Sequence, residues 1–354
     1  MLTRCTFLFF IISIVFGITP PVLATTIAGQ VYEAETEQAI YYVNVFLANT
    51  KIGTTTNEQG RYQIRGIPAG SYKLVVQHVG YKLYTQQVFV DSLVDTLNID
   101  IQLEPKVFTG EEIEVTAKDA VEWRQQLEIF EREFIGESSF ASQCDIKNPE
   151  VLSFYVDEDN FLSAWAERVL QIHNHALGYR IYVVLDYFRW HVEGTRGAFV
   201  HFARYEDMDA SSKAQEQLWT EHREYAYNRS REHFFSDVAE RSLQDSVYTV
   251  YAELFNNLKR GEGEAISPTE VYAATQDTLS VHMLKYPLDL RIDQTVSEKA
   301  EPLSTLIYLA EGRILFDDWG NIVNLADVKF YGAWAEQRLA DFLPATYSPS
   351  NTTD

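Results

Sequence analysis

Cysteine is almost absent from this sequence, whose 354 residues include only Cys5 and Cys144. Cys5 lies in an N-terminal segment with the features of a cleaved secretion signal, so we expect Cys144 to be the one cysteine of the mature chain. A single thiol cannot form an intramolecular disulfide, which excludes a disulfide-stapled extracellular scaffold. A lone thiol can act as a nucleophile or pair between chains, but it is more often a small apolar side chain packed in a core.

Basic residues are also scarce, because 29 Lys and Arg face 51 Asp and Glu and the formal net charge is −22. Such a charge repels phosphate backbones and anionic membrane surfaces, so nucleic acid is not expected as a partner. Most of the acidic excess lies beyond Lys106. Attraction of cations would explain it, and so would solubility alone.

The sequence lacks the local motifs of the common enzyme classes. It has no Gly-x-Ser-x-Gly elbow, phosphate-binding loop, dinucleotide fingerprint or His-Glu-x-x-His helix. No histidine is followed by glutamate three residues later, as the zinc site of metallocarboxypeptidases requires. The sequence therefore predicts no catalytic residue, no metal site and no cofactor.

Apart from its start, the chain has no long hydrophobic run. Arg4 precedes the apolar stretch 7–18, and Val22-Leu23-Ala24 ends in the small residues of a cleavage site. The stretch is short for a membrane span. We therefore expect residues 1–24 to be a signal peptide, with export to the periplasm or the outer-membrane surface and no transmembrane span after cleavage. An uncleaved anchor is the alternative.

Residues 25–106 have the pattern of an all-β domain. Short alternating segments follow one another at the spacing of strands, and they are separated by turns such as 57–60 and 66–70, which are rich in glycine. In the segment 71–79, Tyr72, Leu74 and Val76 share one face. Seven such strands, the last of them over 96–103, predict a β-sandwich.

Several segments of this region resemble one family. They are Gly29-Gln30-Val31-Tyr32, the block 53–62, the block 67–72 and Val79-Gly80-Tyr81. They are similar to the carboxypeptidase-regulatory-like domain, which implies a seven-stranded transthyretin-like (prealbumin-like) sandwich without catalytic activity. The resemblance favours a docking or binding module and leaves the ligand open.

Residues 107–118 are expected to be a linker. The stretch 110–117 is similar to the segment that follows this domain in TonB-dependent receptors. The rest of the chain is too short for a receptor barrel. The stretch is therefore either a plain connector or a strand that docks on a partner.

Residues 119–347 predict an α+β domain with an antiparallel sheet, and residues 348–354 a disordered tail. An apolar stripe at helical spacing favours a helix over 119–135, and alternating segments between 151 and 205 favour a meander of strands. We expect a loop at 144–149 and a closing helix over 333–343. The segments 134–136, 144–149, 176–179 and 334–338 resemble exported Bacteroidota-type proteins with an uncharacterised second domain. That resemblance implies a location and an architecture but no reaction.

Aromatic residues gather in this meander. Trp165, Tyr187, Phe188 and Trp190 are the candidates for ligand binding. If exposed, they would form a platform for carbohydrate or peptide. If buried, they would belong to the core, which is the more common arrangement.

Two histidines and two acidic turns raise the question of metal binding. His173 and His175 share a face if they lie on a strand, and they could hold a metal ion with a third ligand, which the sequence does not identify. Without one, a solvated strand face is expected. The acidic loops 157–159 and 317–318 lack the calcium-binding ladder of ligands, so they are interpreted as turns.

These observations favour a non-catalytic exported envelope protein that binds an envelope protein or polymer. One alternative is an envelope hydrolase with its site in residues 118–345. Another is an accessory subunit of a TonB-dependent outer-membrane complex.

Overall fold

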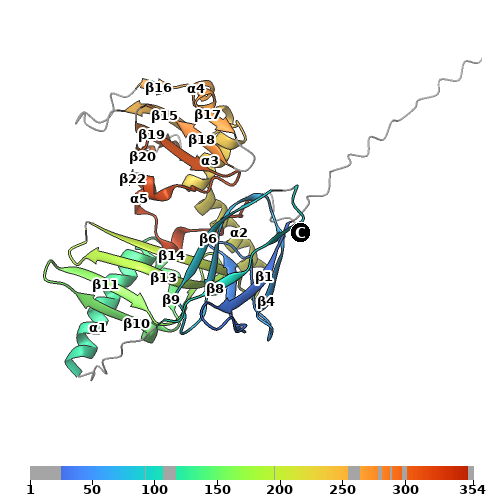
Figure 1. Ribbon diagram of the computed structural model, residues 1–354. Helices are drawn as coiled ribbons and strands as arrows, with labels where there is room; N and C mark the ends of the chain where they lie inside the picture. The colour runs from blue at the N-terminus through green and yellow to red at the C-terminus, as the bar shows by residue number, and fades with distance from the viewer. Residues whose placement is uncertain are drawn as a thin grey trace, which may run out of the picture.

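The computed structural model describes residues 25–91, 93–106, 117–194, 196–253, 264–277, 281–287, 289–296 and 301–349. The predicted signal peptide, most of the predicted linker and residues 350–354 of the predicted tail lie outside these ranges. The described chain is mostly β-structure in antiparallel sheets, and it forms three parts with separate cores (Figure 1). No helix among the described residues is long and apolar enough to cross a membrane.

The N-terminal part consists of short strands in two sheets. One sheet has the order β4-β1-β7, with β8 also paired to β1, and the other has the order β3-β2-β5-β6. The strands are β1 (Thr25–Glu33), β2 (Asn44–Leu47), β3 (Gly53–Thr55), β4 (Arg61–Ile67), β5 (Gly70–Gln77), β6 (Tyr84–Val90), β7 (Thr96–Asn98) and β8 (Ile101–Leu103). Both sheets contribute buried residues to one core, including Ile27, Ile64, Leu74 and Val88.

The last predicted strand of this part, 96–103, is interrupted in the structure. β7 and β8 both pair in parallel with β1, and Ile99 and Asp100 lie between them. A Cβ on Gly29 would lie 1.8 Å from the Ile99 carbonyl oxygen. Only glycine allows this close approach, which explains its place in β1.

The second part is built on a six-stranded sheet of order β10-β11-β13-β12-β9, with β14 paired to β13. Its strands are β9 (Cys144–Ile146), β10 (Leu152–Val156), β11 (Phe161–Ala166), β12 (Leu170–Asn174), β13 (Tyr179–His191) and β14 (Gly197–Asp207). The expected helix over 119–135 is α1 (Ala117–Phe130), continued by a π-helical turn, Glu131–Ile135. The rings of Phe130 and Phe134 pack on one face of the sheet.

The third part has a five-stranded sheet, β16-β15-β19-β20-β22, and a three-stranded sheet, β17-β18-β21. Its elements are β15 (Tyr248–Glu253), β16 (Glu264–Ile266), β17 (Thr275–Asp277), β18 (His282–Lys285), β19 (Asp289–Gln294), β20 (Leu303–Leu309), β21 (Arg313–Phe316), β22 (Val328–Gly332), α3 (Arg231–Ala239), α4 (Pro268–Ala273) and α5 (Ala333–Glu336). The preceding helix α2 (Lys213–Asn228) leads into it from the second part. Region 119–347 thus contains two core clusters, and the chain returns to the first through Leu339 and Ala340.

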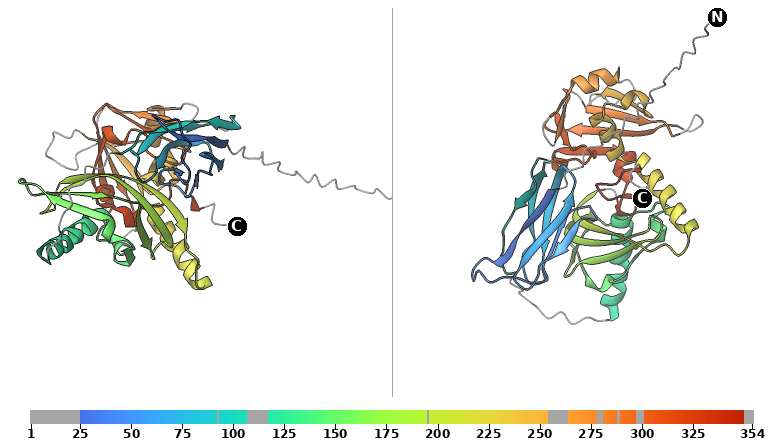
Figure 2. Two further views of the ribbon diagram at one scale, coloured as in Figure 1. Left: turned by 60° about the horizontal axis from the view of Figure 1, so that its bottom comes forward. Right: turned by 90° about the vertical axis from the view of Figure 1, so that its right-hand side faces the viewer.

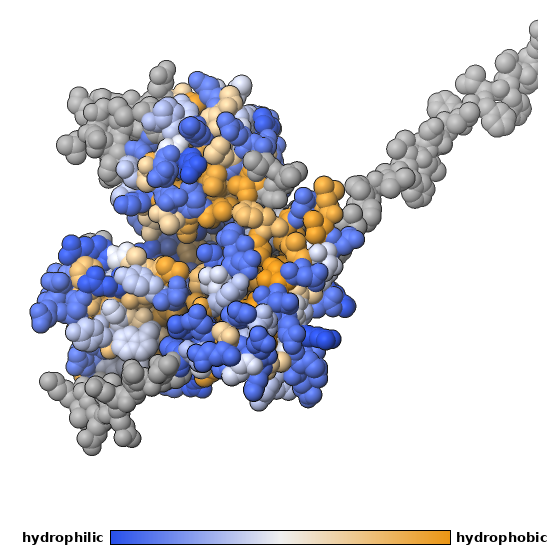
Figure 3. Space-filling model, viewed as in Figure 1, coloured by the Kyte–Doolittle hydropathy of each residue, from blue (hydrophilic) through white to orange (hydrophobic). Residues whose placement is uncertain are grey.

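The N-terminal part docks on the six-stranded sheet, on the face opposite α1. Phe46 and Val75 pack against Phe202 of β14, and Val184 of β13 lies beside them. The Asn49 amide donates to the Ala203 carbonyl at 2.6 Å, and the Tyr205 amide donates to the Thr50 carbonyl at 2.8 Å. Figure 2 shows the blue N-terminal sheets standing beside the green sheet, and in Figure 3 apolar surface gathers around the junction of the parts.

Candidate functional site

The six-stranded sheet has one covered face and one partly open face. Side chains alternate between the two faces along each strand, so that neighbours in sequence point in opposite directions. The covered face carries the core under α1. The open face is occupied at its centre by the N-terminal part, through Val184 and Phe202. Both groups of predicted site residues lie on this sheet.

The four predicted aromatic residues divide between the two faces. Phe188 is 2% exposed and Trp190 is 9% exposed, and both belong to the core. The Phe188 ring lies 4.9 Å from that of Phe130. A buried ring cannot contact a surface ligand, so Phe188 and Trp190 follow the alternative of core residues and are not part of the candidate surface. Trp165 and Tyr187, in contrast, are 47% and 46% exposed.

A third exposed ring, Tyr155, completes this surface and is not among the residues predicted from the sequence. Tyr155 is 59% exposed and lies opposite Ser163 on β11, while Trp165 lies opposite Ser153 on β10. The small serines leave the rings uncovered. Tyr155 shares a face with Trp165 only through the register of β10 with β11, which the sequence does not reveal. Tyr155, Trp165 and Tyr187 together are called the aromatic face below.

Polar groups border the aromatic face. Arg189 lies opposite Ser163, its guanidinium lies over the Phe161 ring at 4.1 Å, and it donates to Asp157 at 2.6 Å. These hydrogen bonds to Arg189 and to backbone amides lower the pKa of Asp157. Within the described chain, neither the Trp165 indole nor the phenols of Tyr155 and Tyr187 form a hydrogen bond to the protein. Their polar atoms therefore stay available to a ligand.

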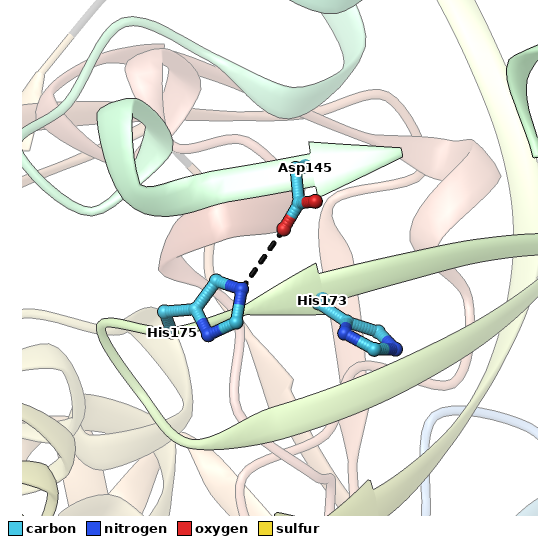
Figure 4. Close-up of side chains that lie close together, drawn as sticks. All are labelled: Asp145, His173 and His175. Carbon is cyan, nitrogen blue, oxygen red and sulfur yellow. Dashed lines mark hydrogen bonds and ion pairs between the residues drawn. The ribbon is translucent and has the colours of Figure 1, made fainter. Parts of the chain in front are cut away.

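His173 and His175 gain a third potential ligand, Asp145. In the antiparallel pair of β9 and β12, Asp145 lies directly opposite His173. The His175 Nε2 atom lies 2.9 Å from the Asp145 Oδ2 atom, and one ligand atom from each of the three residues lies within 4.8 Å of the others. Figure 4 shows the three side chains together on β9, on β12 and just beyond it. The sequence pattern favours a loop at 144–149, so the pairing of β9 with β12 is not visible in the sequence.

The electrostatic surroundings of this cluster are mixed. Lys147 forms an ion pair with the Asp145 Oδ1 atom. Burial acts to raise the pKa of Asp145, but its hydrogen bonds to Lys147 and His175 outweigh this effect and lower it. Burial, followed by the charge of Lys147, lowers the pKa of His173. Asp145 and His175 are about half exposed, so an ion can reach them from solvent.

The acidic loops form turns that use their own carboxylates. The Asp157 Oδ1 atom accepts hydrogen bonds from the amides of Asp159 and Phe161, at 3.0 and 2.9 Å. The Asp317 Oδ1 atom accepts from the amides of Trp319 and Asn321 at the same distances. Asn57 forms the same turn with the amides of residues 59 and 61. The fourth residue has positive φ in all three turns, which explains glycine or asparagine there.

Cys144 is partly buried, and its thiol donates to the Phe140 carbonyl at 3.5 Å. Burial, followed by the neighbouring carboxylates of Asp341 and Asp145, raises its pKa to about 12. A thiol in this state is a poor nucleophile, because only the thiolate reacts. The geometry therefore fits the packing interpretation of Cys144.

A comparison with curated proteins found no match. Among solved structures, a pilus 2b backbone protein of group B streptococcus is 17% identical, with a TM-score of 0.20, and covers 23% of this chain and 41% of its own. This chain thus spans about two fifths of that protein. A DUF3823 family protein from Bacteroides ovatus is 12% identical, covers 53% and 82% of the two chains, and has a TM-score of 0.19.

A protein of unknown function from Bacteroides fragilis covers 88% of this chain and 98% of its own, at 10% identity and a TM-score of 0.19. Similarities this remote carry no argument about function. The family comparison is more specific, because the model of the CarboxypepD_reg-like domain matches residues 27–115. This match confirms the resemblance expected from the glycine-rich blocks: the front of the chain is a carboxypeptidase-regulatory-like domain.

Proposed function

We propose that this is a non-catalytic, exported cell-envelope protein that binds a neutral glycan of the envelope on its aromatic face. The observation that carries the proposal is the exposure of Trp165 and Tyr187 on one face of the six-stranded sheet. Amphipathic rings of this kind offer an apolar face to the C–H groups of a sugar and polar atoms to its hydroxyls. The net charge of −22 disfavours a polyanionic ligand.

In this proposal the carboxypeptidase-regulatory-like domain, interpreted as a transthyretin-like sandwich, serves as a docking module within its own chain. It packs on β13 and β14 through Phe46, Val75 and Phe202. Tyr187 lies on β13 near this contact, so the docked domain supports the strand that carries the ring. The expected location, in the periplasm or at the outer-membrane surface, follows from the predicted signal peptide.

The test is binding of the purified chain from residue 25 onward to panels of neutral polysaccharides, peptidoglycan fragments and peptides. We expect Trp165→Ala to weaken glycan binding about tenfold, or about 1.4 kcal/mol, and Tyr187→Ala to act similarly. Tyr41→Ala, which removes a ring 58% exposed on the N-terminal part, is the matched control and should bind normally.

Undiminished glycan binding by the double variant of Trp165 and Tyr187 would refute the proposal. Binding to peptides alone would assign the face to a protein partner. Turnover of a substrate would favour the envelope hydrolase. Recovery of a receptor from solubilised outer membrane would favour the accessory subunit of a TonB-dependent complex, whose expected docking stretch, 110–117, lies almost wholly outside the described residues.

A further inference from the structure

We propose that Asp145, His173 and His175 form a binding site for a divalent transition-metal ion of the Zn²⁺ class. The donor set is two imidazole nitrogens and one carboxylate oxygen, whose ligand atoms lie within 4.8 Å of one another. Imidazole suits zinc, nickel and copper, whereas calcium and magnesium prefer oxygen ligands alone. Three protein ligands leave at least one position open for water or another molecule.

The backbone that carries these ligands is held in place on several sides. Asp145 and His173 are paired across β9 and β12. The His175 amide donates to the Gln143 carbonyl at 3.0 Å, and the His175 carbonyl accepts from the Trp219 indole at 2.8 Å. Asn174 is fully buried, and its side chain donates to the Ala340 carbonyl at 2.9 Å. Ring rotation alone can then bring the nitrogens together, because the main chain is already positioned.

The polar contacts of the cluster are compatible with a bound ion. The Asp145 carboxylate has two oxygens: Lys147 contacts Oδ1, and His175 contacts Oδ2. A metal ion would replace the hydrogen bond between His175 and Oδ2, while Lys147 could keep the other oxygen. The ammonium group of Lys147 still repels a nearby cation, so it is expected to limit the affinity.

A bound ion would join an edge strand to the sheet. β9 has three residues, Cys144–Ile146, and pairs with β12 only among the described strands. An ion that binds the folded protein and not the unfolded chain raises the free energy of unfolding by RT ln(1 + [L]/Kd), which grows with the logarithm of its affinity. The site therefore predicts stabilisation by the metal as well as binding.

The experiment uses the chain from residue 25 onward without a histidine tag, titrated with ZnCl₂ by calorimetry and with CoCl₂ by visible absorption. We expect one metal per chain and cobalt bands typical of nitrogen and oxygen ligands. His173→Ala, His175→Ala and Asp145→Asn should each weaken Zn²⁺ binding at least about tenfold. Lys147→Ala should strengthen it about threefold, because it removes a repelling charge. His191→Ala, on the same sheet, is the control and should bind normally.

Thermal melting of each metal-free variant checks that the variant folds. Zn²⁺ should raise the melting temperature of the unaltered chain and of His191→Ala, but not that of His173→Ala. Three results would overturn the proposal. They are no saturable Zn²⁺ binding below millimolar concentration, equal binding of Ca²⁺ and Zn²⁺, or folded His173→Ala and His175→Ala variants that bind Zn²⁺ normally.

Discussion

The contact between the N-terminal part and the six-stranded sheet should depend strongly on one ring, that of Phe202. This residue is 9% exposed and packs against Phe46 and Val75, which are 4% and 0% exposed. Replacing Phe202 by alanine removes its apolar contacts with Phe46 and Val75 of the N-terminal part and with Val184 of β13. The substitution does not remove the atoms that form the backbone hydrogen bonds of Asn49 and Tyr205. It therefore tests whether apolar packing keeps these hydrogen bonds formed.

The expected magnitude follows from the burial of the ring. Phe→Ala substitutions in full cores cost about 3–5 kcal/mol. This ring belongs to a small cluster with some exposure, so we expect about 2–3 kcal/mol. The Lys51–Asp207 ion pair cannot compensate, because its side chains are 40% and 52% exposed and such pairs contribute about 0–1 kcal/mol.

Hydrogen exchange of the backbone amides measures this loss locally. In Phe202→Ala, the amides of Asn49 and Tyr205 should exchange at least about thirtyfold faster, the equivalent of about 2 kcal/mol. The two parts should also unfold in separate steps in urea, because the N-terminal part has its own core. Tryptophan fluorescence follows mainly the second and third parts, because all six tryptophans lie beyond residue 110. The Trp319 indole also reports on the N-terminal part, because it donates to the Ala69 carbonyl at 3.3 Å.

Val200→Ala is the matched control, because Val200 lies on the same strand and is 44% exposed. Its effect should stay below about 0.5 kcal/mol. If Phe202→Ala and Val200→Ala exchange at the same rate at Asn49 and Tyr205, packing does not hold the domain on the sheet. The proposed role of the N-terminal part would then fail.

Three further predictions concern single residues. His282 donates hydrogen bonds to Asp318 at 2.6 Å and to Asp277 at 2.9 Å, and these bonds raise its pKa. Its contribution to stability should therefore be complete below about pH 6.5 and be lost as pH rises through the folded pKa. Urea unfolding from pH 5.5 to 9 should show this loss of stability, and His282→Ala should flatten the pH dependence. Gly29→Ala should lower stability by several kcal/mol, about as much as the most damaging single substitutions, because the added Cβ clashes with Ile99. Gly66→Ala should cost about 1 kcal/mol, because a Cβ at Gly66 meets nothing within 4 Å and only its positive φ is strained. Thermal melting compares the two variants, and equal losses of stability would contradict the clash with Ile99. Cys144, with its pKa raised to about 12, should react with a thiol reagent at pH 8 much more slowly in the native protein than in urea, and equal rates would contradict its burial.

Local patterns in the sequence predicted the strands of the N-terminal part well. Alternation such as Tyr72, Leu74 and Val76, bounded by glycine turns, depends on neighbours in sequence and is visible without the structure. The interruption of the strand over 96–103 was not visible, since it arises where Ile99 crosses Gly29 far away in the chain. The expected closing helix, 333–343, is instead α5 followed by a separate 3-10 turn at Leu339–Asp341.

The candidate sites were predicted in part for the same reason. Adjacent residues on a strand point to opposite faces, so Tyr187 and Phe188 could not both line one surface, and alternation alone would have shown this. The position of α1 decides which of the two residues, Tyr187 or Phe188, points to solvent. Likewise, His173 and His175 share a face by spacing, but Asp145 joins them only through the pairing of β9 with β12. That pairing is nonlocal, and no sequence pattern near Asp145 reports it.

The aromatic face and the proposed metal site lie on the same sheet but should act independently. His173 lies opposite Arg180 on β13, and Tyr187 follows seven residues later on that strand, a separation of about 20 Å. The docked N-terminal part contacts Val184 between them. Effects at sites this far apart, with no shared partner, normally add. Trp165→Ala should therefore leave Zn²⁺ binding unchanged, and His173→Ala should leave glycan binding unchanged. Phe202→Ala loosens the docked N-terminal part, which lies between the two sites. If that part stiffens β13, Phe202→Ala should weaken both Zn²⁺ binding and glycan binding.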